Sequence, residues 1–113
     1  MALIYDLPVY KDVYALTMRI FTLTSNFSRE YKFTLGQDLK RDCIQLVRSI
    51  YRANKVKDKV VYLERFLDDF EVIKLEVRLC CDLKLISRGQ MAEVASLMSN
   101  IGRQITGWRN AQG

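Results

Sequence analysis

The 113-residue sequence contains no histidine, one proline and five glycines. Without histidine it lacks the commonest general base and the commonest metal ligand. Neither glycine-rich phosphate loop, the P-loop or G-x-G-x-x-G, is present. So few turn residues disfavour an all-β fold, which needs many tight turns. We therefore expect an all-α protein that is not an enzyme and has no catalytic residues, no metal site and no cofactor.

Cysteine and long apolar runs are also scarce. The three cysteines are Cys43, Cys80 and Cys81, an odd count with two members adjacent on an expected helix. This pattern argues against a disulfide framework and against a zinc site. No secretory signal is visible, and no apolar run reaches the roughly 20 residues that a membrane span needs. We expect a cytoplasmic protein with no membrane partner.

Half of the residues are hydrophobic, and many recur with the 3.6-residue period of a helix. Pro8 suits a first helical turn, and Thr34 to Gln37 and Ser87 to Gln90 both fit the capping-box pattern. The periodicity predicts helices over about residues 8–27, 35–54, 57–86 and 88–108. Short loops make successive helices antiparallel, so the sequence predicts one domain over residues 1–113, an antiparallel up-and-down four-helix bundle.

Several of these helices carry more apolar residues than one core stripe needs. One interpretation is a generously packed core with scattered exposed aliphatic residues, which are common on protein surfaces. The interpretation that we favour is a homo-oligomer, because a helix that is apolar on two sides is usually buried on two sides. The predicted interface residues are Val72, Leu75, Leu79, Leu83, Ile86 and Tyr51.

The net charge is +5, and it is unevenly spread. Residues 34–57 carry six basic and two acidic side chains, and four of the basic ones share a helical face: Arg41, Arg48, Arg52 and Lys55. Arginine forks match phosphate oxygens, so such a row can follow a nucleic-acid backbone without reading its sequence. The alternative is a solvated face that only aids solubility.

Three strings of the sequence resemble the Avd-like four-helix-bundle proteins. They are Tyr31 to Gly36, Asp82 to Ser87 and Ile101 to Trp108, in this order and spacing. Avd is the accessory variability determinant of diversity-generating retroelements. The wider group is similar to the four-helix proteins encoded in intervening sequences of bacterial ribosomal RNA genes.

The resemblance implies a homopentameric barrel with a basic surface and no catalytic site. It implies two partners, a reverse transcriptase and nucleic acid (RNA and DNA), and a role in mutagenic reverse transcription and retrohoming. The basic residues that match such a surface are Arg41, Arg48, Arg52 and Lys55, followed by Lys32, Lys40, Arg103 and Arg109. Two alternatives stay open: a stand-alone nucleic-acid-binding bundle without a polymerase partner, and a purely structural oligomer.

Overall fold

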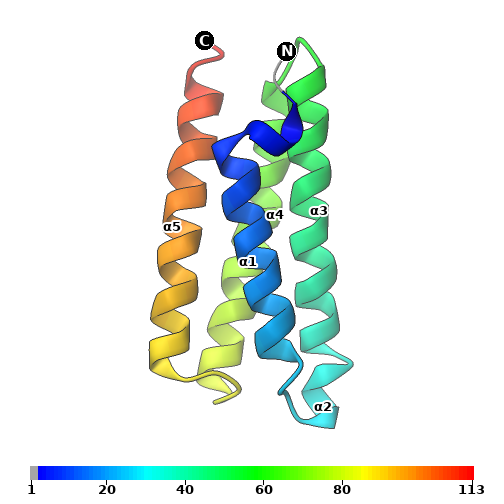
Figure 1. The fold of residues 1–113 in the computed structure, drawn as a ribbon, viewed down its shortest axis with the longest axis vertical. Coiled ribbons are helices and arrows are strands. Elements are labelled where there is room, and N and C mark those ends of the chain that lie inside the picture. Colours follow the sequence, from blue (N-terminus) through cyan, green and yellow to red (C-terminus); the bar gives the residue numbers. More distant parts are fainter. Residues whose placement is uncertain (1–2) are drawn as a thin grey trace.

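The computed structural model describes residues 3–113, in which the regular structure is entirely helical. Four long helices form a bundle, as Figure 1 shows. A short 3-10 helix, η1, precedes them, and a single helical turn, α2, lies between the first two long helices. The elements are η1 (Ile4–Asp6), α1 (Pro8–Thr24), α2 (Arg29–Lys32), α3 (Leu35–Lys55), α4 (Val60–Asp82) and α5 (Arg88–Asn110).

Each long helix packs against two others, and these contacts fix the order around the bundle. α1 packs against α3 and α5, and α4 packs against the same two helices. α1 and α4 therefore occupy opposite corners, as do α3 and α5. η1, the C-terminus and the α3–α4 loop lie at one end, and α2 and the α4–α5 turn lie at the other (Figure 1). The fold is the up-and-down bundle that the short loops predict.

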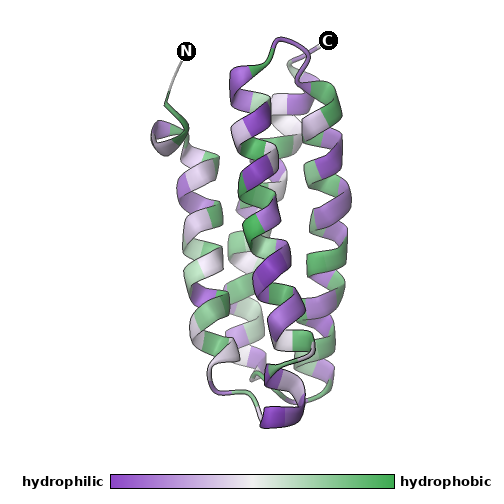
Figure 2. Cartoon of the chain, turned by 90° about the vertical axis from the view of Figure 1, so that its right-hand side faces the viewer, coloured by the Kyte–Doolittle hydropathy of each residue, from purple (hydrophilic) through white to green (hydrophobic). Residues whose placement is uncertain are grey.

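The core is built from the apolar stripes that face inward on all four helices. Leu16, Leu46, Leu63 and Val94, one from each helix, are fully buried. Figure 2 shows hydrophobic and hydrophilic residues alternating along the helical ribbons, as expected for helices with one buried side. Within residues 3–113, no helix combines the length and the low charge that a bilayer crossing requires.

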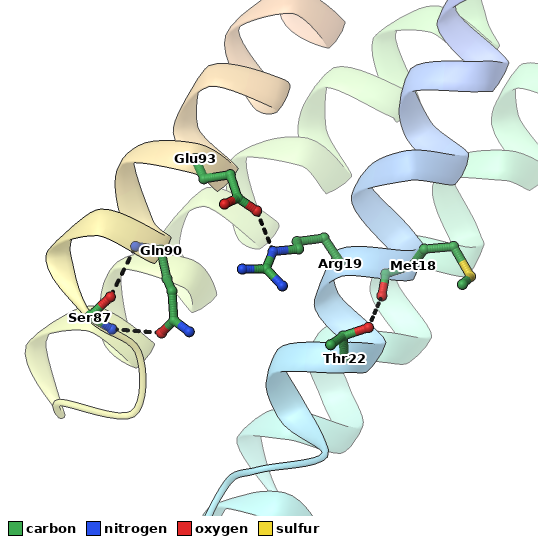
Figure 3. Close-up of polar contacts among 6 residues, drawn as sticks. All are labelled: Met18, Arg19, Thr22, Ser87, Gln90 and Glu93. Carbon is green, nitrogen blue, oxygen red and sulfur yellow. Dashed lines mark hydrogen bonds and ion pairs between the residues drawn. The ribbon is translucent and has the colours of Figure 1, made fainter.

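The two predicted capping boxes have different outcomes. At the start of α5, Ser87 Oγ accepts a hydrogen bond from the Gln90 N–H at 3.1 Å, and Gln90 Oε1 accepts one from the Ser87 N–H at 2.9 Å (Figure 3). At the start of α3 the prediction is wrong. The Thr34 hydroxyl donates instead to the Glu30 carbonyl at 2.7 Å, because the helical turn α2 places that carbonyl within its reach.

The predicted bounds of two helices also need correction. α1 ends at Thr24, three residues before the predicted end, although the stripe residue Phe27 is still buried. α4 covers Val60–Asp82 instead of residues 57–86. At its start, Lys59 Nζ donates to the carbonyls of Ala53 and Val56 at 2.7 and 2.8 Å, so the loop lysine satisfies acceptors near the end of α3.

The C-terminal end of α4 is a Schellman motif that periodicity did not reveal. Lys84 adopts φ +63°, its N–H donates to the Cys81 carbonyl, and the Leu85 N–H donates to the Cys80 carbonyl. The chain reverses there and turns Ile86 into the core, where it is 8% exposed. Ile86 is therefore not on the outer surface of α4, and its assignment to the predicted interface was wrong. That assignment assumed that the helix continued to residue 86.

Candidate nucleic-acid interface

A groove between α3 and α4 brings together three arginines. Arg48 and Arg52 lie one turn apart on the exposed side of α3, and Arg65 comes from the facing part of α4. We call this the arginine groove; its volume is about 390 Å³. Its lining residues are Gln45, Arg48, Ser49, Arg52, Tyr62, Arg65 and Asp69.

The arginine groove carries excess positive charge. Within residues 3–113, neither Arg48 nor Arg52 forms an ion pair with a carboxylate. The Arg65 guanidinium lies 5.6 Å from the centre of the Tyr62 ring, which holds it over an aromatic face. Burial raises the pKa of Asp69, the nearby charge of Asp42 raises it further, and Arg65 lowers it. The groove thus presents three guanidinium groups and one carboxyl group, so its positive charges outnumber its negative one.

Two other predicted residues on α3 are engaged locally. Arg41 is exposed, but its guanidinium lies near the carboxylates of Asp38 and Asp42 at 3.4 and 3.5 Å. Lys55 Nζ donates to the Tyr51 hydroxyl at 3.2 Å and lies 4.9 Å from the centre of that ring. Arg41 is therefore partly neutralised by neighbouring acids, while Lys55 keeps an uncompensated charge near the loop end of α3.

The other four predicted basic residues lie outside the arginine groove. Lys32 is on α2, at the end of the bundle away from the α3–α4 loop. Lys40 places its ammonium 5.4 Å from the centre of the Phe21 ring, on the α1 side of α3. On α5, Arg103 donates to Asn100 and Arg109 pairs with Glu64 of α4. The structure does not gather the eight predicted residues into one surface.

Comparison with family models gives one match, to a model described as bAvd-like, over residues 9–112. That range includes the arginine groove and all four long helices except the first residue of α1. The chain belongs to the bAvd-like family. A comparison with curated protein sequences returns no match.

In this bAvd-like protein, five lining residues of the groove were missed by sequence reasoning: Gln45, Ser49, Tyr62, Arg65 and Asp69. Arg65 lies among the acidic residues of α4, so the net charge of that segment did not single it out as a candidate site residue. A usable signal was the antiparallel pairing across the short α3–α4 loop. Residues at similar distances from that loop face each other, which places Arg65 level with Arg48 and Arg52.

The bAvd-like protein also exposes apolar side chains on the outside of α4. Val72, Leu75, Leu79 and Leu83 are 40–59% exposed and recur at helical spacing along one face. We call these four residues the α4 stripe. Tyr51, the other predicted interface residue, is exposed on α3, on a different side of the bundle. Among residues 3–113, no cluster of acidic residues and cysteines is arranged to hold a metal ion.

Proposed function

We propose that this bAvd-like protein is a non-catalytic accessory protein of a diversity-generating retroelement. In this role it binds the element's reverse transcriptase and its template RNA or cDNA, and so supports mutagenic reverse transcription and retrohoming. Membership of the bAvd-like family supports the proposed role in a diversity-generating retroelement. The arginine groove supports the contact with nucleic acid, and it is the observation on which the proposed chemistry rests.

The contact works through phosphate. Arg48 and Arg52 are separated by four residues, or roughly 6 Å along the helix axis. Arg65 faces them from α4 and Tyr62 supplies an aromatic surface, so a bound strand meets several cations and a ring in one concave place. Guanidinium forks bind phosphate oxygens in pairs, and such contacts are independent of base sequence. Binding therefore depends strongly on salt and weakly on sequence.

Self-association is part of the same proposal. The α4 stripe presents four aliphatic side chains in a row, and contiguous exposed apolar surface of this kind marks a protein contact. The resemblance to Avd-like proteins implies a homopentamer. Assembly would multiply the arginine grooves available to one nucleic-acid strand, which strengthens binding without any new kind of contact.

The groove is tested by removing two of its charges. We expect Arg48→Gln/Arg52→Gln to weaken binding to fluorescently labelled single-stranded RNA, single-stranded DNA and RNA–DNA hybrid, measured by anisotropy between about 50 and about 300 mM salt. The slope of log affinity against log salt should become shallower by roughly 1.5 per binding groove, since each lost phosphate contact removes about 0.7 to 0.9.

The matched control is Lys74→Gln/Arg78→Gln, which removes the same charge from the α5 side of α4. Both side chains pair there with acids of their own helix. We expect this control to keep the wild-type salt slope. Equal losses in both double variants would mean that net charge alone drives binding, and the arginine groove would then have no special role.

A further inference from the structure

A hollow of about 490 Å³ lies at the end of the bundle that carries the α3–α4 loop and the C-terminus (Figure 1). The start of α1, the end of α3, the α3–α4 loop and the last turn of α5 border it. We call it the end hollow. Its lining includes Leu7, Lys55, Val56, Lys57, Lys59 and Trp108. Its volume is that of a site for a small molecule or for one unit of a polymer.

Trp108 forms the aromatic wall of the end hollow, and it is the only tryptophan of the chain. Its ring is partly buried against the bundle core, and the rest of it borders the hollow. Leu7 and Val56 add aliphatic surface beside the ring. An aromatic wall of this kind suits a flat ring as occupant, because aromatic rings stack on one another.

Three lysines and no carboxylate line the end hollow. Lys59 is fixed there, because its Nζ donates to two carbonyls near the end of α3 and lies 6.0 Å from the centre of the Trp108 ring. Lys55 and Lys57 are exposed, and within residues 3–113 none of the three lysines forms an ion pair. Asp58, the one acid of the α3–α4 loop, does not line the hollow. The charge therefore favours an anionic occupant.

The end hollow adjoins the arginine groove. Arg52 lines the groove and Lys55 lines the hollow, and the two share a face of α3 about 4.5 Å apart along the helix axis. At the start of α4, Tyr62 of the groove follows Lys59 of the hollow in the same way. A polyanion that leaves the groove toward the loop therefore meets the next cations beside an aromatic ring.

We propose that the end hollow binds an unpaired nucleobase of a single-stranded nucleic acid, with the base stacked on Trp108 and the adjoining phosphates at Lys55 and Lys57. This inference rests on the nucleic-acid contact in the proposed function, to which it adds a second site and a preference for single strands. A base inside a duplex has both faces covered by its neighbours, so a duplex reaches the lysines without stacking on the ring.

Trp108 itself reports the stacking, because the chain has no other tryptophan. We expect a labelled single-stranded RNA or DNA to quench Trp108 fluorescence as it binds, since the base stacks on the indole ring. The matched ligand is an oligonucleotide of the same length that lacks its bases and keeps its phosphates. It should bind, with a rise in the anisotropy of its label, and leave Trp108 fluorescence unchanged.

Variants separate the ring from the charges. Trp108→Leu should weaken single-strand binding roughly fivefold or more, the usual loss when one stacking ring is removed, and Trp108→Phe should retain most of the affinity. Both should bind as the wild type does to a duplex much longer than one binding site.

Lys55→Gln/Lys57→Gln removes the phosphate contacts instead of the ring. It should weaken binding of the single strand and of the abasic oligonucleotide alike, and still show quenching when the single strand saturates it. Lys74→Gln/Arg78→Gln removes the same charge from α4 and is the matched control. The quenching experiment uses the wild-type chain, so it decides the matter even if Trp108→Leu loses its helical circular dichroism.

The outcomes distinguish this inference from the proposed function. A wild type that binds no nucleic acid would remove both. Binding without quenching, or equal quenching by the abasic oligonucleotide, would overturn the end hollow alone and leave the arginine groove as the contact. A folded Trp108→Leu protein that binds single strands normally but no longer co-purifies with the reverse transcriptase would assign the hollow to that enzyme, which also overturns the inference.

Discussion

Glu76 is a carboxyl group in the middle of α4 that is only 8% exposed, and its Oε1 atom has no hydrogen-bond partner within residues 3–113. Burial raises its pKa to about 8, helped by a hydrogen bond with Asp42 and by the charges of Asp42 and Asp38, while Arg41 acts in the opposite direction. Asp42 and Asp38 belong to α3. The α3–α4 contact that forms the arginine groove therefore contains a carboxyl group that stays protonated at neutral pH.

This protonation predicts a pH-dependent stability. Unfolded Glu76 ionises near pH 4.5 and folded Glu76 near pH 8, so between these values the folded state holds a proton that the unfolded state has lost. The free energy of unfolding should fall as pH rises through this window, by at most about 1.4 kcal/mol per pH unit. Glu76→Gln keeps a donor and cannot ionise, so it should flatten this dependence. Urea denaturation between about pH 5 and about pH 8.5 measures it.

The upper limit of this pH range avoids the ionisation of Cys43. Burial raises the pKa of this thiol in the folded state to about 12. Thiol ionisation in the unfolded state would add its own loss of stability above about pH 9. Glu71→Gln, an exposed position on the same helix, is the control and should keep the wild-type slope. Equal slopes in the wild type and Glu76→Gln would show that Glu76 titrates normally in the fold.

At the scale of elements, the turn between α4 and α5 determines where α4 ends and which side chains near its end are exposed. Lys84 holds the left-handed conformation at φ +63°, and the Schellman hydrogen bonds end α4 four residues before the predicted boundary. Non-glycine residues are strained in this region, so the geometry is imposed by its surroundings. The buried side chain of Ile86 and the capping box of α5, which follow Lys84 in the chain, hold it in this conformation.

We expect Lys84→Gly to raise the free energy of unfolding by roughly 0.5–1 kcal/mol, because glycine adopts positive φ without a Cβ clash. Lys74→Gly, at an exposed position inside α4, should instead lower it by about 1 kcal/mol. Chemical denaturation of both variants compares the two sites directly. A destabilised Lys84→Gly protein would mean that the lysine side chain contributes more to the turn than its backbone strain costs.

The whole molecule measures 44 × 22 × 22 Å, a narrow bundle with much surface for its volume. The α4 stripe and the arginine groove lie on different sides, so the proposed contacts with a second copy and with nucleic acid are compatible. The proposed retroelement role adds a reverse transcriptase as a third partner. Membership of the bAvd-like family supports that partner, and no single surface is assigned to it.

Co-expression with a reverse transcriptase of a diversity-generating retroelement tests that partner. We expect the enzyme to co-purify with the tagged protein after nuclease treatment, since a direct protein contact does not need bridging RNA. A reverse transcriptase from a retroelement without such an accessory protein is the control and should not bind. Loss of the complex upon nuclease treatment, with nucleic-acid binding preserved, would favour the stand-alone nucleic-acid-binding bundle.

The sequence by itself determined the four helices, their inward stripes and the α5 capping box. These depend on the 3.6-residue period and on local hydrogen bonds, which neighbouring residues specify. The strings around Tyr31, Asp82 and Ile101 pointed to the Avd-like family, and the family match confirms it.

Only the tertiary structure decided what depends on contacts between helices. Arg65 joins Arg48 and Arg52 because α4 runs back along α3, and Ile86 is buried because the chain reverses at Lys84. The pKa of Glu76 is raised first by burial between the helices and then by Asp42, which α3 places against it. Each outcome depends on residues distant in the sequence, and the periodicity of one helix carries no information about its neighbour.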